Sequence, residues 1–113
     1  MELEIFQLAL LRRPSDPTGY DDETLDSIQR QHLEYHQRLR AEERVVTNGP
    51  VSDQSDDSLR GLSFYRCGSV QEARALAEAD PAVVAGRLEV EVMTWWCPPG
   101  TMVLPGTPLT IDD

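Results

Sequence analysis

The chain has 113 residues, a formal net charge of −10 and 27% charged residues, which is typical of one globular domain. The excess of acids argues against nucleic acid and anionic membrane surfaces as partners, because both bind through a basic face. The absence of lysine excludes Schiff-base chemistry, and no apolar run reaches the ~20 residues of a membrane span.

The N-terminal stretch and the cysteines indicate the cellular compartment. The first residues, MELEIFQLALL, carry acids where a signal peptide carries bases, and no small-residue cleavage site follows them. Cys67 and Cys97 are too far apart for a CxxC motif, and two cysteines do not make a disulfide framework. We therefore expect a cytoplasmic protein with two reduced, structural thiols.

The predicted elements begin with a strand and a long helix. Residues 2–11 are strongly apolar and predict a central strand, and the proline-containing loop RRPSDPTGYDD after it is long enough to border a pocket. Residues 22–43 predict a helix with acids in its first turn. One face of this helix carries, at spacings of three or four residues, Leu25, Ile28, His32, His36 and Leu39. Both histidines are therefore expected to face the protein interior.

The second half of the chain predicts strands at 44–50, 59–67 and 87–96, and a helix at 70–79. Ser69 and Glu72 have the spacing of a capping box at the start of that helix. The order βαββαβ predicts an α+β, ferredoxin-like fold with an antiparallel sheet. We expect this domain to span residues 1–96, and residues 97–113 to form a proline-rich, extended tail.

Asp80 allows two interpretations. Asp followed by Pro81, with Gly86 shortly after, is typical of a short helical turn that Asp caps. A cap needs only one carboxylate oxygen, so a chemical role for the other oxygen is compatible with it. The sequence around Asp80 leaves both roles open.

His32 is also open to more than one interpretation. Its ring could simply form a local hydrogen bond on the inward face of the helix. Alternatively, it could act as a general acid or base with a carboxylate fixing its tautomer. Asp80 is a candidate for that carboxylate if the long helix and the turn meet. The segment HLEYH also resembles a metal-binding pair, but it is not HExxH and no third ligand is signalled, so we expect no metal.

With these residues in view, the chain resembles the YCII-related (YciI-like) family. The resemblance rests on HLEYHQRLRAEERVVTNGP, on the strand around Gly61, on GSVQEARALAEADPAVVAG and on a last strand ending in two tryptophans. It implies a dimeric α+β barrel, in which the sheets of two ferredoxin-like halves pack face to face. It also implies an active site of His32 and Asp80, with Ser69, Gly49 and Pro50 near the cavity or supporting it.

The chain departs from this family at three positions that bear on the cavity. The family usually has an apolar residue at the position of His36, a small one at that of Asn48, and an aromatic one at that of Ala82. These differences imply a roomier and more polar cavity, in which His36 and Asn48 could bond to a carbonyl or hydroxyl of the substrate.

Two functional hypotheses follow. The first is a cofactor-independent lyase or isomerase in which His32 and Asp80 transfer a proton on a small molecule. The second is a binding or regulatory module that uses the same cavity without chemistry. In both cases we expect a homodimer, because Phe6, Leu8 and Leu10 would give the second face of the sheet too much exposed apolar surface.

Overall fold

The computed structural model describes residues 1–103, 106 and 108. The described part contains strands β1 (Glu4–Arg12), β2 (Val45–Pro50), β3 (Leu59–Tyr65) and β4 (Glu89–Cys97) and helices α1 (Asp22–Ala41), α2 (Val70–Glu78) and α3 (Pro81–Val84). A 3-10 turn, η1, follows at Thr101–Val103. The βαββαβ order is the predicted one, with α3 as a short helix inserted before the last strand.

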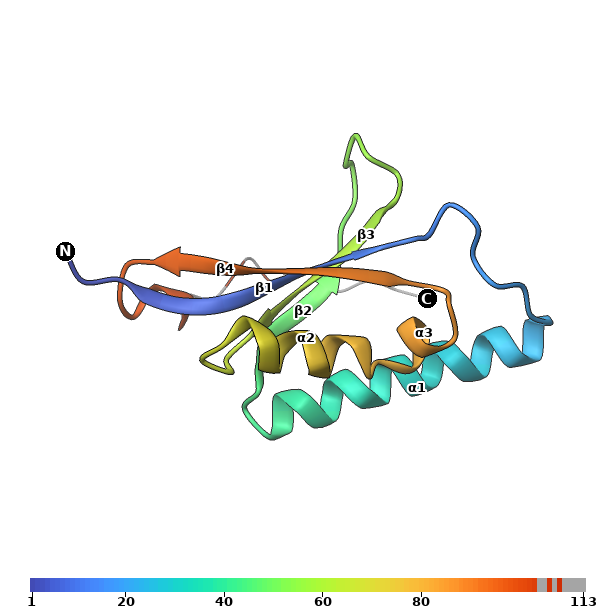
Figure 1. Cartoon of the computed structure of the whole chain (residues 1–113), viewed down its shortest axis with the longest axis horizontal. Coiled ribbons are helices and arrows are strands. Elements are labelled where there is room, and N and C mark those ends of the chain that lie inside the picture. Colours follow the sequence, from blue (N-terminus) through green and yellow to red (C-terminus); the bar gives the residue numbers. More distant parts are fainter. Residues whose placement is uncertain (104–105, 107, 109–113) are drawn as a thin grey trace.

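The four strands form one antiparallel sheet in the order β2-β3-β1-β4. All three helices lie on one face of it (Figure 1). This is the ferredoxin-like α+β arrangement, so the predicted fold class is confirmed. β1 lies between β3 and β4, and an inside position agrees with its strongly apolar sequence.

The core fills the space between the sheet and the helices. Its buried members are Ala9, Leu39, Val45, Tyr65, Ala73, Ala77 and Val92. The two alanines of α2 are four residues apart and thus share a helix face, and small side chains there let α2 lie close to the sheet. Strand alternation sends Ser63 and Tyr65 of β3 toward the helices.

The helix ends show why these segments fold as they do. The side chain of Asp21 caps α1 by accepting a hydrogen bond from the backbone N–H of Thr24 at 2.8 Å. Ser69 caps α2 in the predicted way, accepting from the backbone N–H of Glu72 at 3.2 Å. α1 ends at Ala41, two residues earlier than predicted, and Glu43 has a left-handed φ of 60°.

The loop after β1 is tied to the end of α3. The Thr18 N–H donates to the carbonyl of Gly86 at 3.2 Å, Nη1 of Arg87 donates to the carbonyl of Thr18 at 2.8 Å, and the Tyr20 hydroxyl donates to the carbonyl of Ala85 at 2.8 Å. Gly86 has a φ of +77°, and a Cβ there would collide with the Thr18 hydroxyl. These bonds hold the loop beside α3 and α1.

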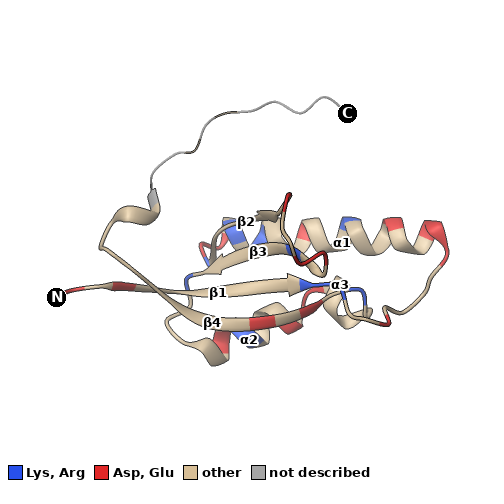
Figure 2. Ribbon diagram, turned by 90° about the horizontal axis from the view of Figure 1, so that it is seen from above, with Lys and Arg blue, Asp and Glu red and all other residues tan. Residues whose placement is uncertain are grey.

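The opposite face of the sheet is not covered by any described element (Figure 2). Strand register places on this face the apolar side chains of Phe6, Leu8, Leu10, Leu62, Phe64, Met93 and Trp95. Phe64 and Trp95 meet edge to face with ring centroids 5.6 Å apart, and Trp95 is 40% exposed. The predicted second apolar face therefore exists and includes more than β1.

The C-terminal segment is only partly described. Cys97, expected at the start of the tail, is the last residue of β4, and η1 follows it. The remainder of the predicted extended tail lies largely outside the described residues. Among the helices that are described, none combines the length and apolar character needed to cross a membrane.

Candidate active site

Asp80 lies between α2 and α3, where it caps α3. Its Oδ1 atom accepts a hydrogen bond from the backbone N–H of Ala82 at 2.9 Å, and Pro81 occupies the first turn of the helix. The residue is fully buried, with 0% exposure. A cap on the surface would leave its second oxygen in water, whereas this one has its second oxygen inside the protein.

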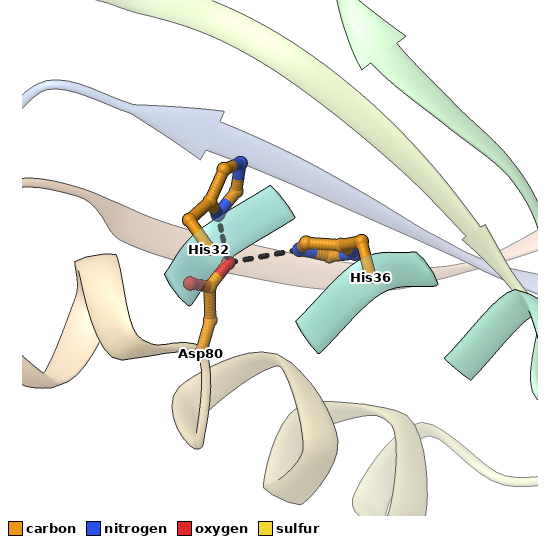
Figure 3. A group of neighbouring side chains, drawn as sticks. All are labelled: His32, His36 and Asp80. Carbon is orange, nitrogen blue, oxygen red and sulfur yellow. Dashed lines mark hydrogen bonds and ion pairs between the residues drawn. The ribbon is translucent and has the colours of Figure 1, made fainter. Parts of the chain in front are cut away.

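That second oxygen, Oδ2, meets both histidines of the chain. Nδ1 of His32 lies 2.7 Å from it and Nε2 of His36 lies 2.8 Å from it (Figure 3). The histidines are one turn apart on α1, so both reach the same carboxylate. The helix and the Asp-Pro turn, 48 residues apart in sequence for His32 and Asp80, thus do meet.

The surroundings of Asp80 favour its ionised form. Burial alone would raise its pKa, but the hydrogen bonds from His32 and His36, the charge of His32 and the amide of Ala82 outweigh burial and lower the pKa to about 2. Asp80 is therefore a carboxylate at neutral pH, and both histidines donate an N–H to it.

The two histidines have different surroundings. His36 is 1% exposed, and its Nδ1 atom is buried without a hydrogen-bond partner among the described residues. The side chain of His32 is 15% exposed and lines a cavity. Nδ1 of His32 is used on Asp80, so Nε2 is the ring atom available to a ligand, and in the neutral ring it carries the lone pair.

The cavity next to His32 has a volume of about 450 Å³. It lies between α1, β2, the start of β3, the end of β1, α3 and the segments after β1 and α3. Asn48, Gly49 and Pro50 of β2 line it, and so does Ala82. The side-chain oxygen of Asn48 accepts a hydrogen bond from Arg40, which turns the amide group into a fixed donor toward its surroundings.

The structure does not bring all the expected site residues to this cavity. His36 does not line the cavity, and its Nε2 atom contacts the carboxylate of Asp80. Ser69 caps the far end of α2 from Asp80 and is also absent from the lining. The cavity therefore brings His32 together with the β2 residues, Asp80 lies directly behind His32, and His36 is a buried second partner of Asp80.

A family comparison matches this arrangement of elements. The YCII-related domain matches residues 8–96, which include α1, the Asp80 turn and all but the ends of the sheet. The chain belongs to the YCII-related family. A relative, the uncharacterized protein YjpA of Bacillus subtilis (strain 168), is 34% identical over 64 residues, which are 57% of this chain and 71% of that protein.

A solved structure of similar fold belongs to an enzyme. It is 5-chloro-2-hydroxyhydroquinone dehydrochlorinase (TftG) from Burkholderia phenoliruptrix AC1100, in complex with 2,5-dihydroxybenzoquinone. The likeness covers 81% of this chain and 93% of that one, with a TM-score of 0.54 and 21% identity. At this level of identity the likeness concerns the fold and agrees with the α+β arrangement described above.

Three arginines of this YCII-related chain line the cavity and were not expected there. They are Arg13 after β1, Arg60 in β3 and Arg87 after α3. Each belongs to a different segment, and no motif joins them in the sequence. The only sequence signal was the proline-containing loop after the first strand, which was expected to border a pocket and which contains Arg13.

The cluster of His32, His36 and Asp80 also contains ligand types that zinc accepts. One ligand atom from each residue lies within 4.8 Å of the others. Oδ2 of Asp80, however, lies 2.7 and 2.8 Å from the two nitrogens, whereas ligand atoms on tetrahedral zinc lie about 3.4 Å apart. The distances are those of a hydrogen-bonded cluster.

The cysteines lie outside the site. Both are free thiols, and Cys97 is buried. Burial raises the pKa of Cys67, with a smaller contribution from Glu72, so the reactive thiolate is disfavoured. Neither cysteine lines the cavity, which agrees with the structural role expected for them.

Proposed function

We propose that this protein is a small-molecule enzyme of lyase or isomerase type, in which His32 transfers a proton. The observation that carries the proposal is the 2.7 Å contact between Nδ1 of His32 and Oδ2 of Asp80, made by a histidine that lines a cavity of about 450 Å³. A general base needs an orienting partner on one nitrogen and access to substrate on the other, and His32 has both.

In the proposed mechanism Nε2 of His32 takes a proton from a carbon or hydroxyl of the substrate. Asp80 holds the ring in the tautomer with hydrogen on Nδ1, and its negative charge stabilises the imidazolium that forms. Because the pKa of Asp80 is lowered to about 2, it stays ionised while His32 gains and loses the proton. Asp80 is thus a positioning residue and His32 the catalytic one.

The electron pair left by the proton has two possible destinations. In a lyase reaction it forms a double bond as a leaving group departs with its own electron pair. In an isomerase reaction it moves the double bond, and imidazolium returns the proton at another atom. The fold neighbour is named for a dehydrochlorination, a loss of H and Cl from one molecule, and this supports the lyase form here.

Asn48 is the proposed donor to a substrate oxygen. Its carbonyl group is occupied by Arg40, so its amide N–H groups remain for a carbonyl or hydroxyl in the cavity. A donor at that oxygen stabilises the negative charge that develops there when a neighbouring proton leaves.

We further propose that the protein works as a homodimer joined through the open face of the sheet. Most side chains of β3, β1 and β4 on that face are apolar, with Glu91 as an exception, and Trp95 is 40% exposed on it. A second copy would cover it and complete the α+β barrel that the resemblance implied. The two cavities lie on the helix side, so they stay accessible.

The test is proton exchange, which does not require the natural substrate. Chlorinated hydroxyhydroquinones and hydroxylated quinones are incubated with the protein in D₂O, and NMR follows formation of the dechlorinated product or deuterium incorporation. His32→Ala should lower the rate by about 100-fold or more, while Arg74→Gln, an exposed change on α2, should not alter it. Undiminished turnover in folded His32→Ala would refute the mechanism.

A further inference from the structure

The cavity wall carries positive charge that the proposed proton transfer does not use. Arg13, Arg60 and Arg87 all line it, and no Asp or Glu appears among its described lining residues. The protein as a whole has a net charge of −10. Three of its ten basic residues therefore gather at one cavity, against the overall charge of the molecule.

These three charges have no acidic partner within the described part of the chain. Nη1 of Arg87 donates to the backbone carbonyl of Thr18 at 2.8 Å, and Nη1 of Arg60 lies 3.4 Å from the backbone carbonyl of Asp57. Carbonyl partners do not neutralise a guanidinium. Arg12, in contrast, forms an ion pair with Glu91 at 2.7 Å and is not in the lining.

Asp80 does not compensate the arginines either. Its carboxylate already accepts hydrogen bonds from His32, His36 and the amide of Ala82, and it does not itself line the cavity. The residues that surround an anion in this cavity therefore include three arginines and His32, with the buried carboxylate of Asp80 behind His32.

The rest of the wall indicates what the anion is attached to. Apolar side chains in the lining are Leu11, Leu25, Ile28, Leu33, Ala82 and Leu88. An apolar surface does not stabilise a bare inorganic ion. It does stabilise a bound ring or short hydrocarbon chain, because binding removes that group from water. The planar fork of an arginine matches a carboxylate with two parallel hydrogen bonds.

From this arrangement we infer that the ligand is a small organic carboxylate, with its apolar body against α1 and its carboxylate among Arg13, Arg60 and Arg87. The inference rests on the proposed function in one respect, since the same cavity must place a reacting atom at His32. The arginines would then also stabilise the negative charge that proton removal leaves on the substrate.

A binding experiment tests the inference without turnover. Benzoate, neutral benzamide and phenyl phosphate are titrated into the full-length protein at pH 7, with amide NMR shifts as the readout. Benzoate should bind and shift signals of cavity residues, and benzamide should bind at least about five-fold more weakly. Raising salt from 0.05 to 0.5 M should weaken benzoate binding and leave benzamide binding unchanged.

Two matched variants connect the binding to the arginines. Arg60→Gln removes an exposed guanidinium whose one side-chain contact in the described structure is long, so the fold should persist. It should weaken benzoate binding about five-fold or more. Arg74→Gln also removes one positive charge, but from α2, outside the cavity lining, and it should change the affinity for benzoate by less than two-fold.

The outcomes separate this inference from the proposed function. Equal binding of benzoate and benzamide, or equal losses in Arg60→Gln and Arg74→Gln, would overturn the carboxylate site and leave His32 chemistry untouched. Tighter binding of phenyl phosphate than benzoate would also overturn it, because the site would then select phosphate. Arginine-dependent benzoate binding together with full activity of His32→Ala would support the site and refute the mechanism.

Discussion

Nε2 of His36 lies 2.8 Å from Oδ2 of Asp80, the oxygen that also accepts the hydrogen bond from His32. His36 comes from the next turn of α1 and is 1% exposed, so it holds this oxygen from the interior while His32 meets it from the cavity side. With Oδ1 bound to the amide of Ala82, both carboxylate oxygens are fixed. The same fixed carboxylate therefore caps α3 and orients the ring of His32.

Asp80→Ala is expected to destabilise the protein much more than loss of a helix cap does. It removes the cap of α3 and leaves the donor of His36 buried without an acceptor, which should cost about 3 kcal/mol or more of the free energy of unfolding. Ser69→Ala is the matched control, because it removes only a cap, worth about 1 kcal/mol. Urea unfolding at pH 7 measures both. Equal losses would show that the histidine contacts contribute nothing.

Acid should unfold the protein in part through Asp80. Its pKa in the folded state, about 2, lies below the ordinary value of 3.8, so the ionised form stabilises the fold above pH 3.8. That contribution, about 2 kcal/mol, should be lost as the pH falls from about 4 to 2. In Asp80→Asn, which keeps the shape and one acceptor oxygen, stability should fall less over the same range. If the free energies of unfolding of the wild type and of Asp80→Asn fell in parallel over this pH range, the contribution assigned to ionised Asp80 would be contradicted.

His36→Leu should preserve the site while removing the second histidine. The change loses one hydrogen bond to Asp80, but it also removes the buried Nδ1 atom that has no partner and adds apolar contacts. We expect the free energy of unfolding to change by less than about 1.5 kcal/mol and turnover to remain. NMR of the His32 ring should still show its hydrogen bond to Asp80. A loss above about 3 kcal/mol would mean that His36 is needed to hold the carboxylate.

Gly49 of β2 and Gly61 of β3 lie on adjacent, paired strands and can be compared by the same substitution. A Cβ at Gly61 would lie 2.8 Å from the backbone oxygen of Gly49, whereas a Cβ at Gly49 would have nothing within 4 Å. Gly61→Ala must push β2 away and should cost about 1–3 kcal/mol, while Gly49→Ala should be neutral or slightly stabilising. Thermal unfolding compares the two, and equal shifts in Tm would rule out the proposed close approach.

The sequence could predict the fold because the local signals agreed with it. Ser69 caps α2 as its spacing to Glu72 predicted, and α1 turns His32 and His36 inward, as the helix periodicity predicted. The observed element boundaries differ from the predicted ones by one or two residues. At the end of α1, for example, Glu43 adopts a left-handed backbone conformation that its side chain does not predict.

The central pair of the candidate site was predictable from the sequence, but the other residues around the cavity were not. His32 and Asp80 were predicted as a pair, and the structure brings them together. His36 was expected beside a substrate, but helix periodicity alone does not distinguish a cavity-lining residue from one that lies a turn deeper. The three arginines come from separate segments, and only the tertiary structure places them at one wall.

The homodimer is the last expectation that solution measurements can decide. At micromolar concentration, light scattering should give twice the 12.7 kDa chain mass. Phe64→Glu places a charge in the apolar centre of the open sheet face, beside Trp95, and should give a folded monomer because a buried unpaired charge is costly. Val84→Glu, on the opposite side of the molecule and 74% exposed, should stay dimeric. A monomeric wild type, or a dimer that survives Phe64→Glu and not Val84→Glu, would place the interface elsewhere.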